Sequence, residues 1–144
     1  MRKILGVTGI RSEYDIMTPV YRAIEAHSKL QLQLVVTGTH LSPHHNFTLN
    51  QIEKDGFPIA DRIESLFNSD QKSSRAKGLA VQLAGLVQSV SRIEPDFLLV
   101  LGDREVDEGT AAVRSRQGEQ FGAMSHMDAA AWLAQRGLPP SLDL

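Results

Sequence analysis

Charged residues suited to acid–base chemistry follow one of the most apolar runs of the chain. Gly102, Asp103 and Arg104 come directly after residues 97–101, a run typical of a buried parallel strand. Open α/β sheets bind their ligands at the carboxyl ends of such strands. A carboxylate there can transfer a proton or bind a sugar hydroxyl, so Asp103 is the candidate catalytic residue, with Gly102 and Arg104 as candidate binding residues. The residue types alone give equal support to an alternative in which Asp103 caps a following helix.

A second charged loop follows the apolar residues 4–8 and contains Gly9, Arg11 and Glu13. A guanidinium at the start of a helix adds its positive charge to the positive end of the helix dipole. Together they favour binding of an anion such as phosphate. The alternative, slightly favoured by the residues alone, is an exposed Arg11 paired with Glu13 or Asp15. The glycine spacing matches neither a dinucleotide fingerprint nor a phosphate-binding P-loop.

Three histidines lie close together in the loop after the second apolar run. His40 and His44 have the spacing of a ligand pair on a helix, but Pro43 disfavours a helix through this segment. The loop contains no carboxylate. We therefore expect no metal site, and we keep His40, at the end of a strand, as a candidate for contact with a ligand.

The elements that must position these residues alternate along the chain. The hydrophobic periodicity predicts strands at 4–8, 30–36, 57–63 and 97–101, with helices near 16–27, 48–54 and 72–93. This alternation predicts an α/β fold, a Rossmann-like parallel sheet with flanking helices, in the strand order 3-2-1-4. The first and fourth strands are then neighbours, and the loops that carry Arg11 and Asp103 face each other across one cleft.

Local signals refine three of these helices. Pro19 is expected in a first turn, either just after the helix start or behind a capping Thr18. Thr48 and Gln51 have capping-box spacing. The helix at 72–93 carries one apolar stripe, and two glycines near the stripe, Gly78 and Gly85, indicate close packing on the sheet.

Composition limits the class of protein. The 144 residues are 42% hydrophobic and 22% charged, with a net charge of −2 and no cysteine. These values fit one soluble globular domain and exclude a large basic nucleic-acid surface, a disulfide framework and a thiolate metal site. No apolar run approaches the length of a membrane span or a signal-peptide core. We expect a cytoplasmic protein with no nucleic-acid or membrane partner.

The last 39 residues differ from the rest. They contain no lysine and no isoleucine, and Val106 and Val113 are their only β-branched aliphatic residues. We expect a domain at 1–105 and an atypical tail at 106–144 without a fifth buried parallel strand. A short helix is expected at 128–135. An open sheet edge after the fourth strand would favour a homo-oligomer.

Four segments together resemble a known family. Residues 3–14, 36–42, 52–59 and 99–104 are similar to UDP-N-acetylglucosamine 2-epimerases, and more closely to the hydrolysing kind used in sialic-acid biosynthesis. The resemblance implies the amino-terminal half of a glycosyltransferase-B-type fold, with a nucleotide sugar bound between two Rossmann-like halves. It implies elimination of UDP from UDP-GlcNAc, then addition of water to give N-acetylmannosamine, with no metal or redox cofactor.

The resemblance also assigns roles. Arg11 matches a basic residue near the nucleotide phosphates, and Asp103 matches an acid implicated in proton transfer at the sugar. His40 matches a residue near the substrate cleft. Gly9 and Gly102 match glycine turns that let the backbone come close to the bound substrate.

The tail departs from the family pattern. His126 stands where the family has a glycine-containing histidine motif, and we expect the second, nucleotide-binding domain of the family to be absent. We therefore expect an incomplete and inactive fragment, with a truncated or frameshifted tail. A non-catalytic sugar- or phosphate-binding module and a glycosyltransferase of the same architecture stay open as alternatives. A receiver-type phosphoacceptor domain is disfavoured, because Arg11 stands where that family needs acids.

Overall fold

The computed structural model describes residues 1–100, 110–115, 120–125, 128, 131, 132 and 135. Its elements in chain order are β1 (Arg2–Thr8), α1 (Arg11–Glu25), β2 (Leu30–Thr37), two short 3₁₀ segments η1 (Gly38–Leu41) and η2 (Pro43–His45), α2 (Leu49–Lys54), β3 (Ile59–Ile63), α3 (Lys72–Ile93), β4 (Phe97–Val100), β5 (Thr110–Ser115) and β6 (Gln120–Ser125).

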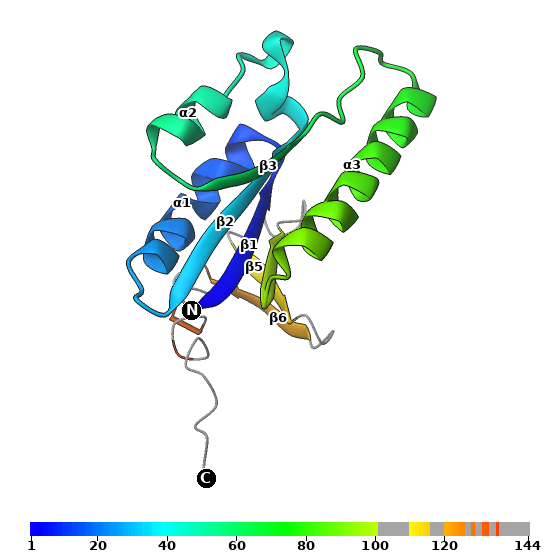
Figure 1. Cartoon of the computed structure of the whole chain (residues 1–144). Coiled ribbons are helices and arrows are strands. Elements are labelled where there is room, and N and C mark those ends of the chain that lie inside the picture. The colour runs from blue at the N-terminus through cyan, green and yellow to red at the C-terminus, as the bar shows by residue number, and fades with distance from the viewer. Residues whose placement is uncertain (101–109, 116–119, 126–127, 129–130, 133–134, 136–144) are drawn as a thin grey trace.

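The strands form one sheet in the order β3-β2-β1-β4-β5-β6 (Figure 1). The first four strands are parallel, with Ile4 of β1 opposite Leu32 of β2 and Phe97 of β4. The predicted α/β class and the order 3-2-1-4 are therefore confirmed. The direction of winding reverses between β1 and β4, and their carboxyl ends share one edge of the sheet.

The outer edge of β4 is covered, contrary to the expectation of an open edge. β5 pairs with it antiparallel, and β6 pairs antiparallel with β5. An antiparallel hairpin needs neither a crossover helix nor the Val/Ile/Leu-rich run of a doubly buried parallel strand. The open edge at β4, which was the reason to expect self-association, is therefore absent from the described sheet. The expectation that no fifth parallel strand follows β4 agrees with the described residues.

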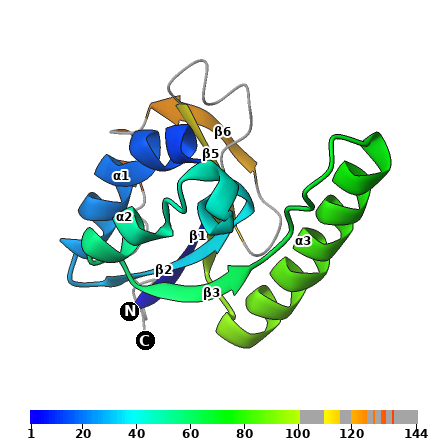
Figure 2. The ribbon, with the colours of Figure 1, turned by 90° about the horizontal axis from the view of Figure 1, so that it is seen from above.

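The helices cover opposite faces of the sheet. α1 and α2 lie on one face and α3 on the other, as the two orthogonal views agree (Figures 1 and 2). The larger core lies under α1 and α2, and a smaller one lies under α3. The smaller core consists of Leu5, Val7, Val35, Ile63 and Ile93.

Pro19 lies in the interior of α1, not in a first turn. A proline there removes one helical hydrogen bond and costs about 3 kcal/mol. Three large side chains around it, Met17, Val20 and Tyr21, are almost fully buried. Packing of this face on the sheet outweighs the local cost, which the sequence pattern underestimated.

The helix at 72–93 forms with the predicted bounds. A β-carbon at Gly85 would lie 2.8 Å from Cγ2 of Ile63, so the close packing expected of this glycine is confirmed. The apolar stripe, however, does not face the core as one surface: Ile93 is buried, but Leu83 is 61% exposed. Gly85 and Ser89 lie close to the sheet, so Leu79 and Leu83 are exposed, whereas Leu86 packs against the smaller core.

The described positions between 128 and 135 have helical backbone, in agreement with the short helix expected there. Trp132 packs edge-on against Phe97, with ring centroids 5.9 Å apart. The tail therefore contacts β4 at Phe97, the first residue of that strand.

Candidate functional site at the carboxyl edge of the sheet

The loops that follow β1 and β2 touch through their backbones. The amide and hydroxyl of Thr39 both donate to the carbonyl oxygen of Gly9, at 2.8 and 3.0 Å. Gly38 has a φ of +59°, and a β-carbon there would lie 2.6 Å from the same carbonyl oxygen. Glycine is therefore required at position 38 for its backbone angle and for the close approach. The two loops form one continuous platform.

Glu13 closes the first loop. Its carboxylate accepts a hydrogen bond of 2.8 Å from the backbone amide of Gly9. An acidic side chain in the first turn of a helix also interacts favourably with the helix dipole. The structure thus gives Glu13 a role in holding the loop, and its contact with a substrate stays a prediction.

Arg11 is the first residue of α1 and is largely exposed. Its guanidinium pairs with Asp15 at 3.4 Å, and the two side chains are 73% and 58% exposed. This is the pairing that the residues alone slightly favoured. Exposed ion pairs are worth at most about 1 kcal/mol, so an anionic ligand can compete for this guanidinium at little cost.

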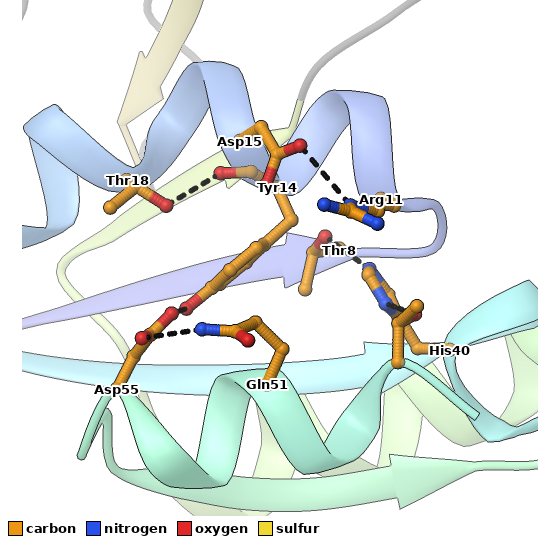
Figure 3. A network of polar contacts seen from close by, with 9 residues as sticks. Thr8, Arg11, Tyr14, Asp15, Thr18, His40, Gln51 and Asp55 are labelled. Atoms are coloured by element: carbon orange, nitrogen blue, oxygen red, sulfur yellow. Dashed lines mark hydrogen bonds and ion pairs between the residues drawn. The ribbon is translucent and has the colours of Figure 1, made fainter. Parts of the chain in front are cut away.

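His40 is completely buried, and its ring points towards Thr8 at the end of β1 (Figure 3). Its Nε2 lies 3.0 Å from the hydroxyl of Thr8, and its Nδ1 lies 2.6 Å from the hydroxyl of Thr48. Burial is the main influence and lowers the pKa of His40, so the ring is neutral near pH 7. The ring therefore links the end of β1 to the start of α2, and its direct contact with a ligand stays a prediction.

The hydroxyl of Thr48 is used by His40 and does not cap α2. Thr48 is the N-cap residue, but it makes no side-chain capping bond, so the predicted capping box is wrong. The hydroxyl instead lies 2.6 Å from Nδ1 of the buried imidazole, and a hydrogen bond to a buried polar atom outweighs the gain from capping.

A second set of polar contacts ties α1 to α2 (Figure 3). Tyr14 donates to a carboxylate oxygen of Asp55 at 2.6 Å, and Gln51 donates to the other oxygen at 2.8 Å. Burial, and secondly the bond to Asp55, raise the pKa of Tyr14, so the phenol stays protonated. These residues fix the helices that carry Arg11 and Thr48.

A pocket of about 590 Å³ opens at the carboxyl ends of β2 and β3, beside the start of α3. Its wall is anchored by the hydroxyl of Thr37, which donates to the carbonyl of Ile63 at 2.7 Å and contacts the hydroxyl of Ser65 at 3.0 Å. The polar lining side chains include Ser42, His44, His45, Glu64 and Asp70.

Sequence reasoning missed this pocket. It treated His44 and His45 as polar loop residues and concentrated on the first and fourth strands. The signal available was the general tendency of ligands to bind at carboxyl strand ends, which applies to β3 as well. Arg75 in the lining suits a phosphate group, and the hydroxyls and carboxylates suit the hydroxyl groups of a ligand.

Three predicted site residues, Gly102, Asp103 and Arg104, lie outside the described residues. Their relation to Arg11 is therefore a prediction that rests on the neighbouring strands. Among residues 1–100 and the described part of the tail, no cluster of three His, Asp or Glu side chains is placed to hold a metal ion. No helix in that part of the chain is long and apolar enough to cross a membrane.

Comparison with known proteins identifies the family. The family model of UDP-N-acetylglucosamine 2-epimerases matches residues 22–115. The chain belongs to this epimerase family. The resemblance found in the sequence is thereby confirmed.

Two curated relatives are hydrolysing sugar-nucleotide epimerases. The chain is 36% identical over 104 residues to the UDP-N,N'-diacetylbacillosamine 2-epimerase (hydrolyzing) of Legionella pneumophila, covering 72% of this chain and 28% of that protein. It is 33% identical over 103 residues to the GDP/UDP-N,N'-diacetylbacillosamine 2-epimerase (hydrolyzing) of Campylobacter jejuni, covering 72% of this chain and 27% of that protein. The chain thus spans little more than a quarter of their length.

A solved structure shows the same fold. The UDP-GlcNAc 2-epimerase of Neisseria meningitidis, crystallised with UDP-GlcNAc, superposes with a TM-score of 0.51 at 17% sequence identity. The superposition covers 67% of this chain and 24% of that one. This epimerase-family chain therefore has the fold of one portion of a larger relative.

A short stretch matches a protein of a different kind. Over 29 residues, 20% of the chain, the sequence is 66% identical to the threonine–tRNA ligase of Acinetobacter baumannii, of which the match covers 4%. This identity is much higher than the identity to the epimerases, over a much shorter length.

Proposed function

We propose that this chain forms the amino-terminal half of the substrate cleft of a hydrolysing 2-epimerase that acts on a UDP-activated 2-acetamido sugar. UDP-GlcNAc is the first candidate substrate. The observation that carries the proposal is family membership combined with the platform at the carboxyl edge of β1 and β2. A polysialic acid biosynthesis protein of Escherichia coli, 33% identical over 104 residues, supports a role in the same area of sugar metabolism.

The proposed reaction has two steps. Removal of the proton at C2 and departure of UDP from C1 form a 2-acetamidoglucal, and water then adds across that double bond to give N-acetylmannosamine. The net change consumes one water and releases UDP. Asp103 is proposed to transfer a proton at the sugar, and Arg11 to bind the diphosphate, with Gly9 and Gly102 leaving space for the ligand.

The exposed position of Arg11 supports this role. The guanidinium stands at the amino-terminal end of α1, where helix dipole and free amides favour an anion. Its only ion pair among the described residues is the exposed one with Asp15. His40 is proposed to act from below, by fixing the strand end and the loop, and Glu13 by closing that loop.

The chain alone is proposed to be a binding module with little or no turnover. Half of an interdomain cleft can neither exclude water nor enclose a nucleotide, and this chain spans 28% of the length of the Legionella relative. We therefore propose that this chain by itself acts as a sugar- or phosphate-binding module. Epimerase activity is proposed for a protein that contains this half of the cleft together with the other half.

A titration and an activity assay test the two statements separately. Chemical shifts of the Arg11 and Thr39 amides are followed by NMR during addition of UDP, UDP-GlcNAc and N-acetylmannosamine. Shifts at these loops without release of UDP are expected. Absence of shifts at millimolar ligand would contradict the proposed site, and release of UDP at the rate of a full-length relative would contradict the proposed inactivity.

We also propose that the stretch similar to the ligase lies in the tail, so that the chain joins sequences of two origins. The epimerase-like and ligase-like stretches together are shorter than the chain, and the tail differs in composition from residues 1–105. The change from parallel strands to an antiparallel hairpin after β4 supports a junction there. Because the family model extends to residue 115, the junction need not fall at 105.

Separate alignments of residues 1–100 and 101–144 with the ligase test this placement. The 29 matching residues are expected in the second part. A match within residues 1–100 would overturn the proposal. A segment equal to 4% of the ligase gives no reason to expect ligase activity.

A further inference from the structure

The pocket at the carboxyl ends of β2 and β3 does not include the loop that carries Arg11. Its walls come from η1, η2, the loop after β3 and the start of α3, which stand at the same end of the molecule (Figure 1). In the sheet, β2 separates β3 from β1. The middle of the β2–β3 pair is therefore two strand spacings, about 10 Å, from the middle of the β1–β4 pair, where the diphosphate is proposed to bind. The pocket is a separate place for a ligand.

Several polar side chains of the lining are free to bind a ligand. Within the described part of the chain, the side chains of Glu64, Asn68 and Asp70 make no hydrogen bond or ion pair. A carboxylate can accept hydrogen bonds from two neighbouring hydroxyl groups, and an amide can donate to one hydroxyl and accept from the next. These groups suit a ligand that carries several hydroxyls.

An apolar wall stands beside these polar groups. It includes Leu41, Leu66 and Phe67, and the Phe67 side chain is 47% exposed. A β-carbon at Gly78 would lie 2.4 Å from the carbonyl oxygen of Ser65 and 3.6 Å from Cδ2 of Phe67, so glycine lets this loop lie against α3. An aromatic ring offers a flat face to the C–H groups of a sugar ring, and aliphatic side chains suit the methyl group of an acyl substituent.

The charges of the lining disfavour a nucleotide. Arg75 taken alone suits a phosphate group. The lining, however, has two carboxylates, Glu64 and Asp70, for this one guanidinium, so its net charge apart from the two imidazoles is −1. A nucleoside diphosphate carries several negative charges, which such a lining repels. A neutral ligand meets no repulsion there.

We propose that this pocket is a second binding site, which takes a neutral N-acylated amino sugar that carries no nucleotide. The sugar ring lies against Phe67, its hydroxyls bind Asn68 and Asp70, and its acyl group meets Leu41. The volume of about 590 Å³ has room for such a ligand. The site follows from its lining, and only the choice of N-acetylmannosamine as the first probe rests on the proposed function. For one small neutral sugar we expect a dissociation constant on the order of millimolar.

The first test compares ligands by NMR on the full chain. N-acetylmannosamine is expected to shift the amides of Phe67 and Asp70, and UDP to shift the amide of Arg11, with neither ligand displacing the other. Mannose, which has a hydroxyl in place of the acylamino group, should bind the pocket roughly fivefold more weakly. Displacement of N-acetylmannosamine by UDP, or equal binding of mannose, would overturn the proposal.

The second test uses substitutions. Phe67→Ala is expected to weaken N-acetylmannosamine binding about tenfold. Phe47→Ala is the matched control, because its ring is also exposed, at 36%, but does not line the pocket, and it should change the affinity less than about twofold. Circular dichroism confirms that both variants are folded. Equal effects of the two substitutions would contradict the site.

Arg11→Gln separates this site from the proposed function. It should weaken UDP binding and leave N-acetylmannosamine binding unchanged, since the pocket does not include Arg11. Absence of a shift at Arg11 with UDP would contradict the proposed function. Absence of a shift at Phe67 with N-acetylmannosamine, or its loss in Arg11→Gln, would contradict the second site.

Discussion

Gly38 meets the carbonyl oxygen of Gly9 so closely that a β-carbon at position 38 would lie 2.6 Å from it. The contact joins the loops after β1 and β2, and it depends on a residue that sequence reasoning passed over. We expect Gly38→Ala to lower the free energy of unfolding by about 3 kcal/mol or more, from the left-handed backbone angle and the steric clash together. Urea denaturation measures the loss.

Gly56 provides the matched control. Its φ is +82°, but a β-carbon there would meet nothing within 4 Å. Gly56→Ala should therefore cost only the backbone term, about 1–2 kcal/mol. Equal losses of stability in the two variants would show that the loops after β1 and β2 lie farther apart than in the structure.

Thr48 is expected to stabilise the protein through His40. Thr48→Val keeps the shape of the side chain but leaves Nδ1 of a buried imidazole without its partner at 2.6 Å. The free energy of unfolding should fall by about 1–3 kcal/mol. Thr48→Ser keeps the hydroxyl and should lose clearly less; if the serine variant is as unstable as the valine variant, the hydrogen bond is not the cause.

The pKa of His40 predicts a pH dependence of stability. Burial lowers this pKa in the folded protein, so the unfolded chain, with an ordinary value of about 6.5, binds the proton more readily. The stabilisation is complete above about pH 6.5 and is lost as the pH falls through that value towards the folded-state pKa. Urea denaturation between pH 5 and 8 should show this fall. In His40→Gln the slope over that range should be smaller, and an unchanged slope would assign it to other groups.

Two tyrosines on α1 should respond in opposite ways to removal of the hydroxyl. The hydroxyl of Tyr21 is buried and has no hydrogen-bond partner among the described residues, whereas that of Tyr14 donates to Asp55. Tyr21→Phe should leave stability unchanged or raise it by up to about 2 kcal/mol, and Tyr14→Phe should lower it by about 1–2 kcal/mol. Thermal denaturation of both variants provides the comparison, and a clear loss in Tyr21→Phe would indicate a partner for its hydroxyl.

Arg11 and Asp15 can be separated by ligand binding. Both Arg11→Gln and Asp15→Asn break the same exposed ion pair, so neither should change stability by more than about 1 kcal/mol. If Arg11 binds the diphosphate, Arg11→Gln should weaken UDP binding roughly tenfold, whereas Asp15→Asn should preserve or strengthen it. NMR titration measures both affinities. Equal weakening in the two variants would assign the effect to the helix end and not to the guanidinium.

The order of the strands and the bounds of α3 could be predicted because periodicity reports local conformation directly. The exposed side chain of Leu83 shows the limit of periodicity, because the spacing of apolar residues indicates one side of a helix but not what covers that side. Pro19 shows another limit: propensity describes the local cost, and the packing of Tyr21 and its neighbours decides the outcome. The role of Thr48 depends on a contact across eight residues with His40, which no capping pattern contains.

For the candidate site, the sequence predicts a position at the carboxyl edge of the sheet but not the contacts that build that edge. The carboxyl edge follows from topology, and Arg11 follows from its place at a helix start. The contact of Gly38 with Gly9 and the burial of His40 depend on how two loops fold against each other, which residue types alone do not determine.

The reversal of strand direction at β5 affects the thickness of the molecule. A connection between parallel strands lays a helix across the sheet, whereas a tight hairpin returns without one. On the side of the larger core, Met124 of β6 and Trp132 of the tail pack against the side chains of the parallel strands. The hairpin and the described tail residues are therefore joined to the domain both by strand pairing and by packing of side chains on its core.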